Sequence, residues 1–185
     1  MSENAERYTR IANGFDARLA GVTGDSWTAP TPCVEWTVRD LVGHVVSVHR
    51  QVIAGLDASA PPPPATDTDL VCAWRDATAG ITAALADPPR ASAPVSGRFA
   101  PMPLEDLIGR LLCSDTLVHT WDLARATTQD EELDPAGVTY AFTMLLPADE
   151  AIRGPASFGP KIQPPPDADE QTRFLCFLGR TPSAR

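Results

Sequence analysis

Several features that would place a chain in a membrane or outside the cell are missing from this sequence. No uncharged apolar run among the 185 residues approaches the length needed to cross a bilayer. The N-terminal stretch 1–20 carries charges throughout and has no apolar segment followed by a small-residue cleavage site, so we expect no secretory signal. These absences predict a cytoplasmic protein with no membrane partner.

Basic residues are outnumbered by acidic ones. The chain has 15 Lys and Arg against 24 Asp and Glu, which gives a formal net charge of −9. A negative surplus of this size repels phosphate backbones and anionic lipid headgroups. The composition therefore argues against nucleic acid as a partner.

Paired cysteines are also missing. The four cysteines, Cys33, Cys72, Cys113 and Cys176, are scattered without a CxxC motif. This spacing argues against a zinc ribbon and against a disulfide framework. We expect reduced thiols instead, and for Cys33 an inert thiol rather than a member of a site.

Strictly alternating, strand-like runs are nearly absent, whereas apolar residues recur at the three- and four-residue spacing of helices. This pattern predicts an all-α fold, and the length suits a single domain over residues 1–185. We expect helices over residues 4–22, 37–56, 69–85, 103–126, 135–146 and 167–178. Prolines mark the remaining segments as loops: 27–36, a rigid connector at 61–64 (PPPP), and 87–103, which forms a loop or a short irregular hairpin.

Three helix starts carry recognisable signals. Thr37 offers a hydroxyl N-cap with Asp40 three residues later, which is close to a capping box. Pro103 suits the first position of the fourth helix, since acidic residues follow in its first turn. Asp167 is the expected cap of the last helix.

The fourth helix carries polar residues where apolar ones are expected. At about 100° per residue, six side chains fall within roughly an 80° arc: Leu104, Ile108, Leu111, Asp115, His119 and Asp122. The polar trio thus continues an apolar stripe that faces the interior. Because an unpartnered buried carboxylate or imidazole costs several kcal/mol, such groups are normally paired, neutralised or bound to a metal.

Asp115 and His119 stand four residues apart, so their side chains can reach one point, which is a chelating geometry. A divalent ion needs a further ligand, and His44 and His49 lie on opposite sides of the apolar stripe of the second helix. Periodicity does not choose between them; only Gly43, which would permit a close helix approach, favours His44. An ion pair or a hydrogen-bonded core pair without a metal is the alternative.

Two stretches, TPCVEWTVRDLVGHVV (31–46) and DTLVHTWDLARAT (115–127), together with FLGRTP (177–182), resemble the mycothiol-dependent maleylpyruvate isomerase-like family of actinobacteria, in the DinB-like superfamily. The resemblance implies an up-and-down four-helix bundle with additional short helices. It also implies three metal ligands, His44, Asp115 and His119, so that the choice of His44 over His49 rests on the resemblance.

Two differences from that family limit the transfer of its activity. The isomerase is a longer protein with an added C-terminal domain, and its carboxylate ligand is a glutamate where this chain has Asp115. We therefore expect a related role rather than maleylpyruvate isomerisation itself.

Two imidazoles and one carboxylate leave at least one coordination position open, which suggests chemistry. Zinc is the expected ion, with nickel, iron and manganese as alternatives. Together with the resemblance, this predicts a metal-dependent thiol transferase or isomerase that acts on a small electrophile with mycothiol or a similar thiol. The alternative is a non-enzymatic metal- or ligand-binding module with a regulatory role.

Asp122 lies one turn further along the same helix face, and we expect its carboxylate to orient a ligand histidine. The alternative role for Asp122 is a helix-terminal hydrogen bond or a salt bridge to Arg125. Trp36 and Trp121 are expected to pack in the core rather than to line a pocket.

Cys113, Leu117 and Trp121 form a second apolar patch on the far side of the fourth helix. Another helix or a second subunit must cover this patch, so a homodimer is expected.

Overall fold

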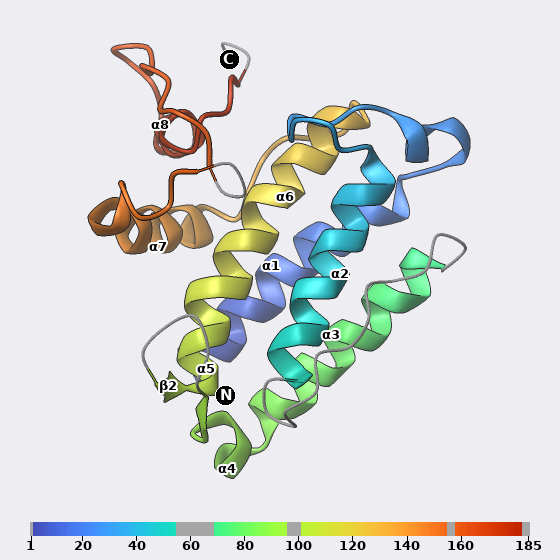
Figure 1. Cartoon of the computed structure of the whole chain (residues 1–185), viewed down its shortest axis with the longest axis vertical. Helices are drawn as coiled ribbons and strands as arrows, with labels where there is room; N and C mark the ends of the chain where they lie inside the picture. The colour runs from blue at the N-terminus through green and yellow to red at the C-terminus, as the bar shows by residue number, and fades with distance from the viewer. Residues whose placement is uncertain (1, 55–68, 96–100, 155–157, 183–185) are drawn as a thin grey trace. The chain divides into compact units, whose positions relative to one another are not determined.

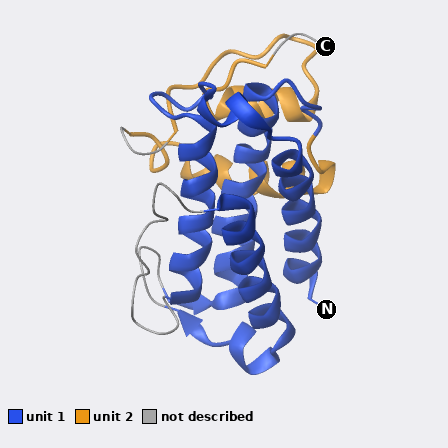
Figure 2. Ribbon diagram, turned by 90° about the vertical axis from the view of Figure 1, so that its right-hand side faces the viewer, with its two compact units in different colours: residues 1–132 blue, residues 133–185 orange. Residues whose placement is uncertain are grey.

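A computed structural model describes residues 2–54, 69–95, 101–154 and 158–182. The chain forms two compact units, residues 1–132 and 133–185 (Figure 2). The expected single domain stays a prediction, and the predicted connector at 61–64 lies outside the described residues.

Four long helices build the first unit (Figure 1). They are α1 (Glu3–Ala20), α2 (Val38–Ala54), α3 (Leu70–Ala86) and α6 (Cys113–Ala126). Both α1 and α2 contact α3 as well as α6, so the four helices close into a bundle. The predicted all-α, DinB-like architecture is confirmed, and α1, α2 and α3 lie within two residues of the predicted bounds 4–22, 37–56 and 69–85.

The helix directions differ from a strict up-and-down alternation. Figure 1 shows that α2 and α3 run the same way, while α1 and α6 run the opposite way. The chain between Ala54 and Leu70 is long enough for this arrangement. It could span up to roughly 50 Å when extended, whereas a 17-residue helix such as α2 is only about 26 Å long.

Short elements lie in the connections between the long helices of this unit. They are the 3₁₀ helix η1 (Gly24–Thr28), α4 (Pro88–Ala91), the two-stranded hairpin β1 (Pro94–Val95) and β2 (Met102–Pro103), α5 (Leu104–Leu107), and the π-helical turn η2 (Ile108–Leu112). The hairpin is antiparallel, with Val95 opposite Met102. The expected irregular hairpin within 87–103 is therefore present, and the helix begins at Leu104, one residue after the predicted Pro103.

The predicted cap of α2 is confirmed in detail. The Thr37 hydroxyl accepts a hydrogen bond from the Asp40 amide at 3.3 Å, and the Asp40 carboxylate accepts one from the Thr37 amide at 2.9 Å. Two amides at the helix start are thereby satisfied reciprocally. The cap fixes where α2 begins, and hence which of its turns carries His44.

The π-helical turn changes which leucine faces the core. The Cys113 amide donates to the carbonyl of Ile108, five residues earlier, so this turn holds one residue more than an α-helical turn. As a result Leu112 is fully buried, whereas the predicted Leu111 is only half-buried. Asp115 and His119 lie beyond the π turn in regular α-helix, so their four-residue spacing holds.

The second unit contains α7 (Pro135–Leu145), the 3₁₀ turn η3 (Leu146–Ala148) and α8 (Glu170–Phe177). Phe142 of α7 packs on Phe174 and Phe177 of α8, at 5.8 and 5.5 Å between ring centroids. The predicted cap of the last helix is wrong. Asp169 rather than Asp167 caps α8, accepting from the Thr172 amide at 2.7 Å.

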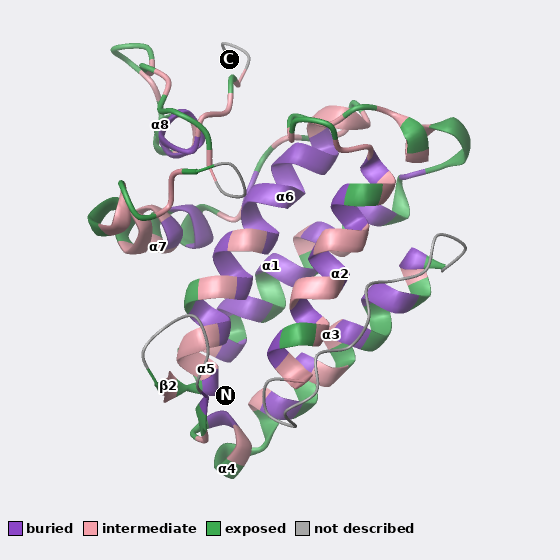
Figure 3. Ribbon diagram, viewed as in Figure 1, coloured by how far each residue is buried: buried purple, intermediate pink, exposed green. Residues whose placement is uncertain are grey.

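Buried residues follow the inner faces of the bundle helices (Figure 3). Trp74 of α3 lies at the centre, with its ring centroid 4.6 Å from that of Phe15 and 5.0 Å from that of His49. Among the described residues, no helix combines the length and apolar character that a membrane span requires.

His49 is a core residue rather than a surface histidine. Its Nδ1 lies 2.8 Å from the Val45 carbonyl, while its Nε2 is buried and has no hydrogen-bond partner within the described ranges. Burial lowers the pKa of His49 to about 4. The folded protein therefore keeps this imidazole neutral where an unfolded chain would protonate it.

We expect the metal-free protein to lose stability as the pH falls from 6.5 to 4. The folded-state pKa of His49 is depressed to about 4, so only the unfolded state takes up a proton in this window. Neutral His49 makes its full contribution to the free energy of unfolding above pH 6.5, and about 3 kcal/mol of that free energy is lost near pH 4. Urea unfolding at stepped pH measures this slope. It should disappear in His49→Leu; an unchanged slope in that variant would assign it to another group.

Candidate metal centre

Helices α2 and α6 bring the three predicted ligands together. His44 Nε2 lies 3.4 Å from Asp115 Oδ1, and His119 Nε2 lies 3.6 Å from the same oxygen. One ligand atom from each residue lies within 4.8 Å of those of the other two. Ligands about 2.0–2.1 Å from a tetrahedral ion stand roughly 3.4 Å apart. The spacing therefore fits a shared divalent cation.

One oxygen of this cluster has no hydrogen-bond partner among the described residues. Asp115 Oδ2 is buried and accepts no hydrogen bond from the part of the chain that is described. A buried carboxylate oxygen without a donor is costly, and a bound cation would compensate it. This atom is the feature of the structure that best fits a metal.

Exposure decreases steadily across the cluster. The His44 side chain is 33% exposed, Asp115 19% and His119 10%. The centre therefore opens to solvent at His44 and is closed at His119. A ligand from solution would approach from the His44 end.

Opposing effects set the protonation of the metal-free cluster. Burial on its own would lower the pKa of His119, but the charge of Asp115 and hydrogen bonds with Asp122 and Cys33 raise it to about 10. Burial would likewise raise the pKa of Asp115, whereas His119 and His44 lower it below its ordinary value. A proton on His119 thus supplies the positive charge in the metal-free state, and a metal ion must compete with it.

Asp122 occupies the position predicted for a residue that orients a histidine ligand. Its Oδ2 lies 3.0 Å from Nδ1 of His119, and its side chain is fully buried. Because Nδ1–H donates to this carboxylate, Nε2 is left to face Asp115 and His44. Arg125, the alternative partner for Asp122, pairs with Glu131 at 2.9 Å.

Cys33 does not lie apart from the site, contrary to the expectation of an inert thiol. Its Sγ lies 3.4 Å from Oδ2 of Asp122 and 3.9 Å from Nδ1 of His119. The loop before α2 holds it there, since Thr31 Oγ1 accepts from the Cys33 amide and the Cys33 carbonyl accepts from the Trp36 amide. Glu35, with φ of 66°, completes this turn. Because a loop has no periodic pattern, residue spacing could not have revealed this contact.

Trp36 also lies at the site, so its expected place in the core is wrong. Its ring centroid is 4.8 Å from that of His44 and 5.9 Å from that of His119. It thereby forms an aromatic wall beside both candidate ligands. Trp121, by contrast, is buried as predicted.

The structure separates the two histidines that periodicity left equivalent. His44 joins Asp115 and His119, while His49 lies in the core against Trp74. Gly43 is not the cause, because a Cβ at this position would meet no atom of the described residues within 4 Å. His44 lies on the side of α2 that faces α6, where its Nε2 is 3.4 Å from Asp115 Oδ1.

The far side of α6 does not require a second subunit. Cys113, Leu117 and Trp121 are all buried within the single chain. The apolar patch from which a homodimer was expected is therefore already covered, and the homodimer itself stays a prediction.

The family to which this bundle belongs follows from comparison with known proteins. Residues 8–124 match the family model described as the mycothiol maleylpyruvate isomerase N-terminal domain. The chain belongs to this family. The match spans α2 and α3 and most of α1 and α6, and so contains His44, Asp115, His119 and Asp122.

Relatives of this chain include two proteins of Mycobacterium tuberculosis, from strains CDC 1551 and H37Rv, both described as uncharacterized. Each is 38% identical over 184 residues, covering 94% of this chain and 96% of the relative. No solved structure gives a significant match. The family match and the mycobacterial relatives agree with the resemblance seen in the motifs. The side-chain clusters of this chain are compatible with metal binding.

Proposed function

We propose that this protein is a metal-dependent thiol transferase or isomerase that uses mycothiol or a similar small thiol on a small electrophile. The observation that carries the proposal is the cluster of His44, Asp115 and His119, which has metal-ligand spacing and a buried carboxylate oxygen without a partner among the described residues. The family description, which names mycothiol, supports the choice of thiol.

The chain's own residues would prepare such a centre for a divalent cation, with zinc as the expected ion. His44 and His119 would contribute Nε2, and Asp115 a carboxylate oxygen, which leaves at least one position open. When bound, the cation supplies positive charge that favours the thiolate of a thiol placed beside it.

Three further features suit a thiol that enters from solution. The exposure at His44 provides an approach to the cluster. Trp36 forms a wall beside His44 and His119, against which an apolar electrophile can pack. Asp122 holds Nδ1 of His119 and so keeps Nε2 directed at the cluster.

The activity test uses zinc-loaded protein, mycothiol and chlorodinitrobenzene, an electrophile that loses chloride as its carbon–sulfur bond forms and the thiol proton passes to buffer. We expect the loaded protein to react on the order of a hundredfold faster than the same protein after chelation. Thioether formation is followed by absorbance. His44→Ala should fall to the chelated rate, and His49→Leu should not.

Equal rates with and without the ion, over several classes of electrophile, would contradict the enzymatic proposal. If zinc still bound at one equivalent, the protein would then be a metal-binding module. Replacing mycothiol with glutathione or free cysteine tests the thiol, since a mycothiol enzyme should lose most of its acceleration with either substitute.

A further inference from the structure

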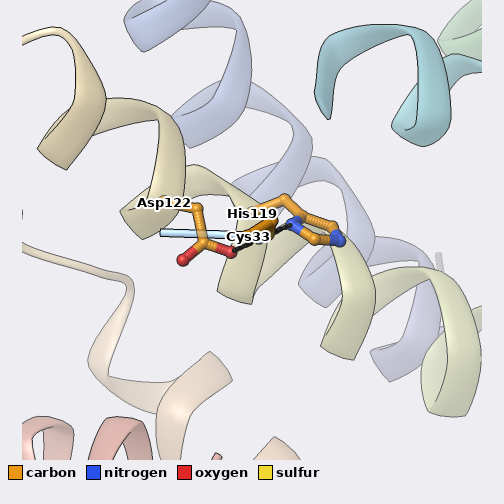
Figure 4. A group of neighbouring side chains, drawn as sticks. All are labelled: Cys33, His119 and Asp122. Carbon is orange, nitrogen blue, oxygen red and sulfur yellow. Dashed lines mark hydrogen bonds and ion pairs between the residues drawn. The ribbon is translucent and has the colours of Figure 1, made fainter. Parts of the chain in front are cut away.

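His119 lies between two groups of potential ligands, one on each edge of its ring. Nε2 faces Asp115 and His44, whereas Nδ1 faces Asp122 and Cys33. Figure 4 shows the second group, in which Asp122 and His119 of α6 point toward one another beside Cys33 of the loop before α2. In the proposed function only the first group holds the ion, and Asp122 serves to orient His119.

The three atoms of the second group have the spacing of metal ligands. The distances are 3.0 Å from His119 Nδ1 to Asp122 Oδ2, 3.4 Å from Cys33 Sγ to that oxygen, and 3.9 Å from Sγ to Nδ1. Sulfur, nitrogen and oxygen ligands of a tetrahedral zinc-like ion stand roughly 3.4–3.6 Å apart. Each observed distance is within about 0.4 Å of this range, so only small shifts are needed.

We propose that Cys33, His119 and Asp122 form a second cation site, which takes a thiophilic divalent ion such as cadmium or zinc and is alternative to the site at His44. The thiolate makes this site soft, whereas the site at His44 offers only nitrogen and oxygen. On binding, Sγ and Nδ1 each bond to the ion, protons from the thiol and from Nδ1 pass to solvent, and no oxidation occurs.

The two sites exclude one another because they share one imidazole. A neutral imidazole presents a single lone pair, and its other nitrogen carries hydrogen. With Nδ1 bound to an ion, Nε2–H would face Asp115; with Nε2 bound, Nδ1–H would face Asp122. The chain should therefore hold one ion at a time, and the softness of the ion decides which edge of His119 is used.

The experiment titrates reduced, metal-free protein with Cd²⁺ and follows the ultraviolet absorption of thiolate-to-cadmium charge transfer. It uses Cys72→Ser protein as the reference, because Cys72 is exposed and could contribute its own thiol. We expect one Cd²⁺ per chain and a saturable band. Adding Cys33→Ser should abolish the band, whereas adding His44→Ala should leave it unchanged.

Three outcomes would overturn the second site: a band that persists without Cys33, a band that disappears in His44→Ala, or two tightly bound ions per chain. Loss in His44→Ala would mean that the thiol serves an ion at the first site. Circular dichroism checks that each variant is folded. The cadmium X-ray absorption spectrum of the unaltered protein tests the same ligand without any variant. We expect a sulfur atom bound to cadmium, and a spectrum without a sulfur neighbour would also overturn the site. Because the band should survive in His44→Ala, its result is independent of the proposed enzymatic activity.

Discussion

Zinc loading at the first site should collapse when His44 is replaced by alanine. In a Cys33→Ser background, where the thiol cannot bind the ion, we expect about one zinc per chain with His44 present and below a tenth of an equivalent without it. The reason is geometric, because His44 is the only ligand that α2 contributes to the cluster. Elemental analysis after desalting measures the loading.

The matched control is His49→Leu in the same background. His49 lies five residues further along α2, but it is buried against Trp74 and outside the cluster. Zinc should still load at about one equivalent, and at a hundredfold excess over its dissociation constant it should stabilise the control by about 2.7 kcal/mol. Loading that follows His49 rather than His44 would contradict the assignment of ligands.

The helices could be predicted because their signals are local. Apolar spacing located the bundle helices, and the Thr37 cap with Asp40 was correct to the hydrogen bond. The cap of α8 was missed because Asp167 and Asp169 both precede a plausible first turn, and only the structure shows which carboxylate meets an amide. Local signals of equal quality cannot be ranked without the rest of the fold.

The chelating pair on α6 could be predicted because four-residue spacing on one helix fixes a geometry. The third ligand could not, since periodicity left His44 and His49 equivalent and only family resemblance favoured His44. The π turn shifted the buried position from Leu111 to Leu112, and no feature of the sequence marks it.

Cys33 and Trp36 were missed for a different reason. Both lie in a loop without periodicity, and Cys33 meets Asp122 across 89 positions of sequence. Such a contact depends on how the loop closes between Thr31 and Trp36, which tertiary structure decides. The part of the site that sequence reasoning found is therefore helical, and the part that it missed comes from a loop.

Trp74→Ala should destabilise the bundle more than any substitution at His44, His49 or Cys33. Trp74 is 1% exposed and packs between Phe15 and His49 at the centre of the bundle. Truncation of a buried tryptophan removes its apolar burial and leaves a cavity, at a cost of about 3–5 kcal/mol. Urea unfolding of the metal-free protein near neutral pH measures the loss, with the same dependence of the free energy of unfolding on urea concentration fitted to both proteins.

Trp27→Ala provides the control for losing an indole, since Trp27 is half-buried and lies beneath the Arg39 guanidinium, 5.2 Å from its ring centroid. It should cost about 1 kcal/mol or less.

Trp74→Ala has a second consequence, because water that enters the cavity would solvate the neighbouring His49. Less desolvation means that the pKa of His49 rises back toward 6.5, so the loss of stability between pH 6.5 and 4 should become shallower in Trp74→Ala. A large loss of stability with an unchanged pH slope would show that the cavity stays dry.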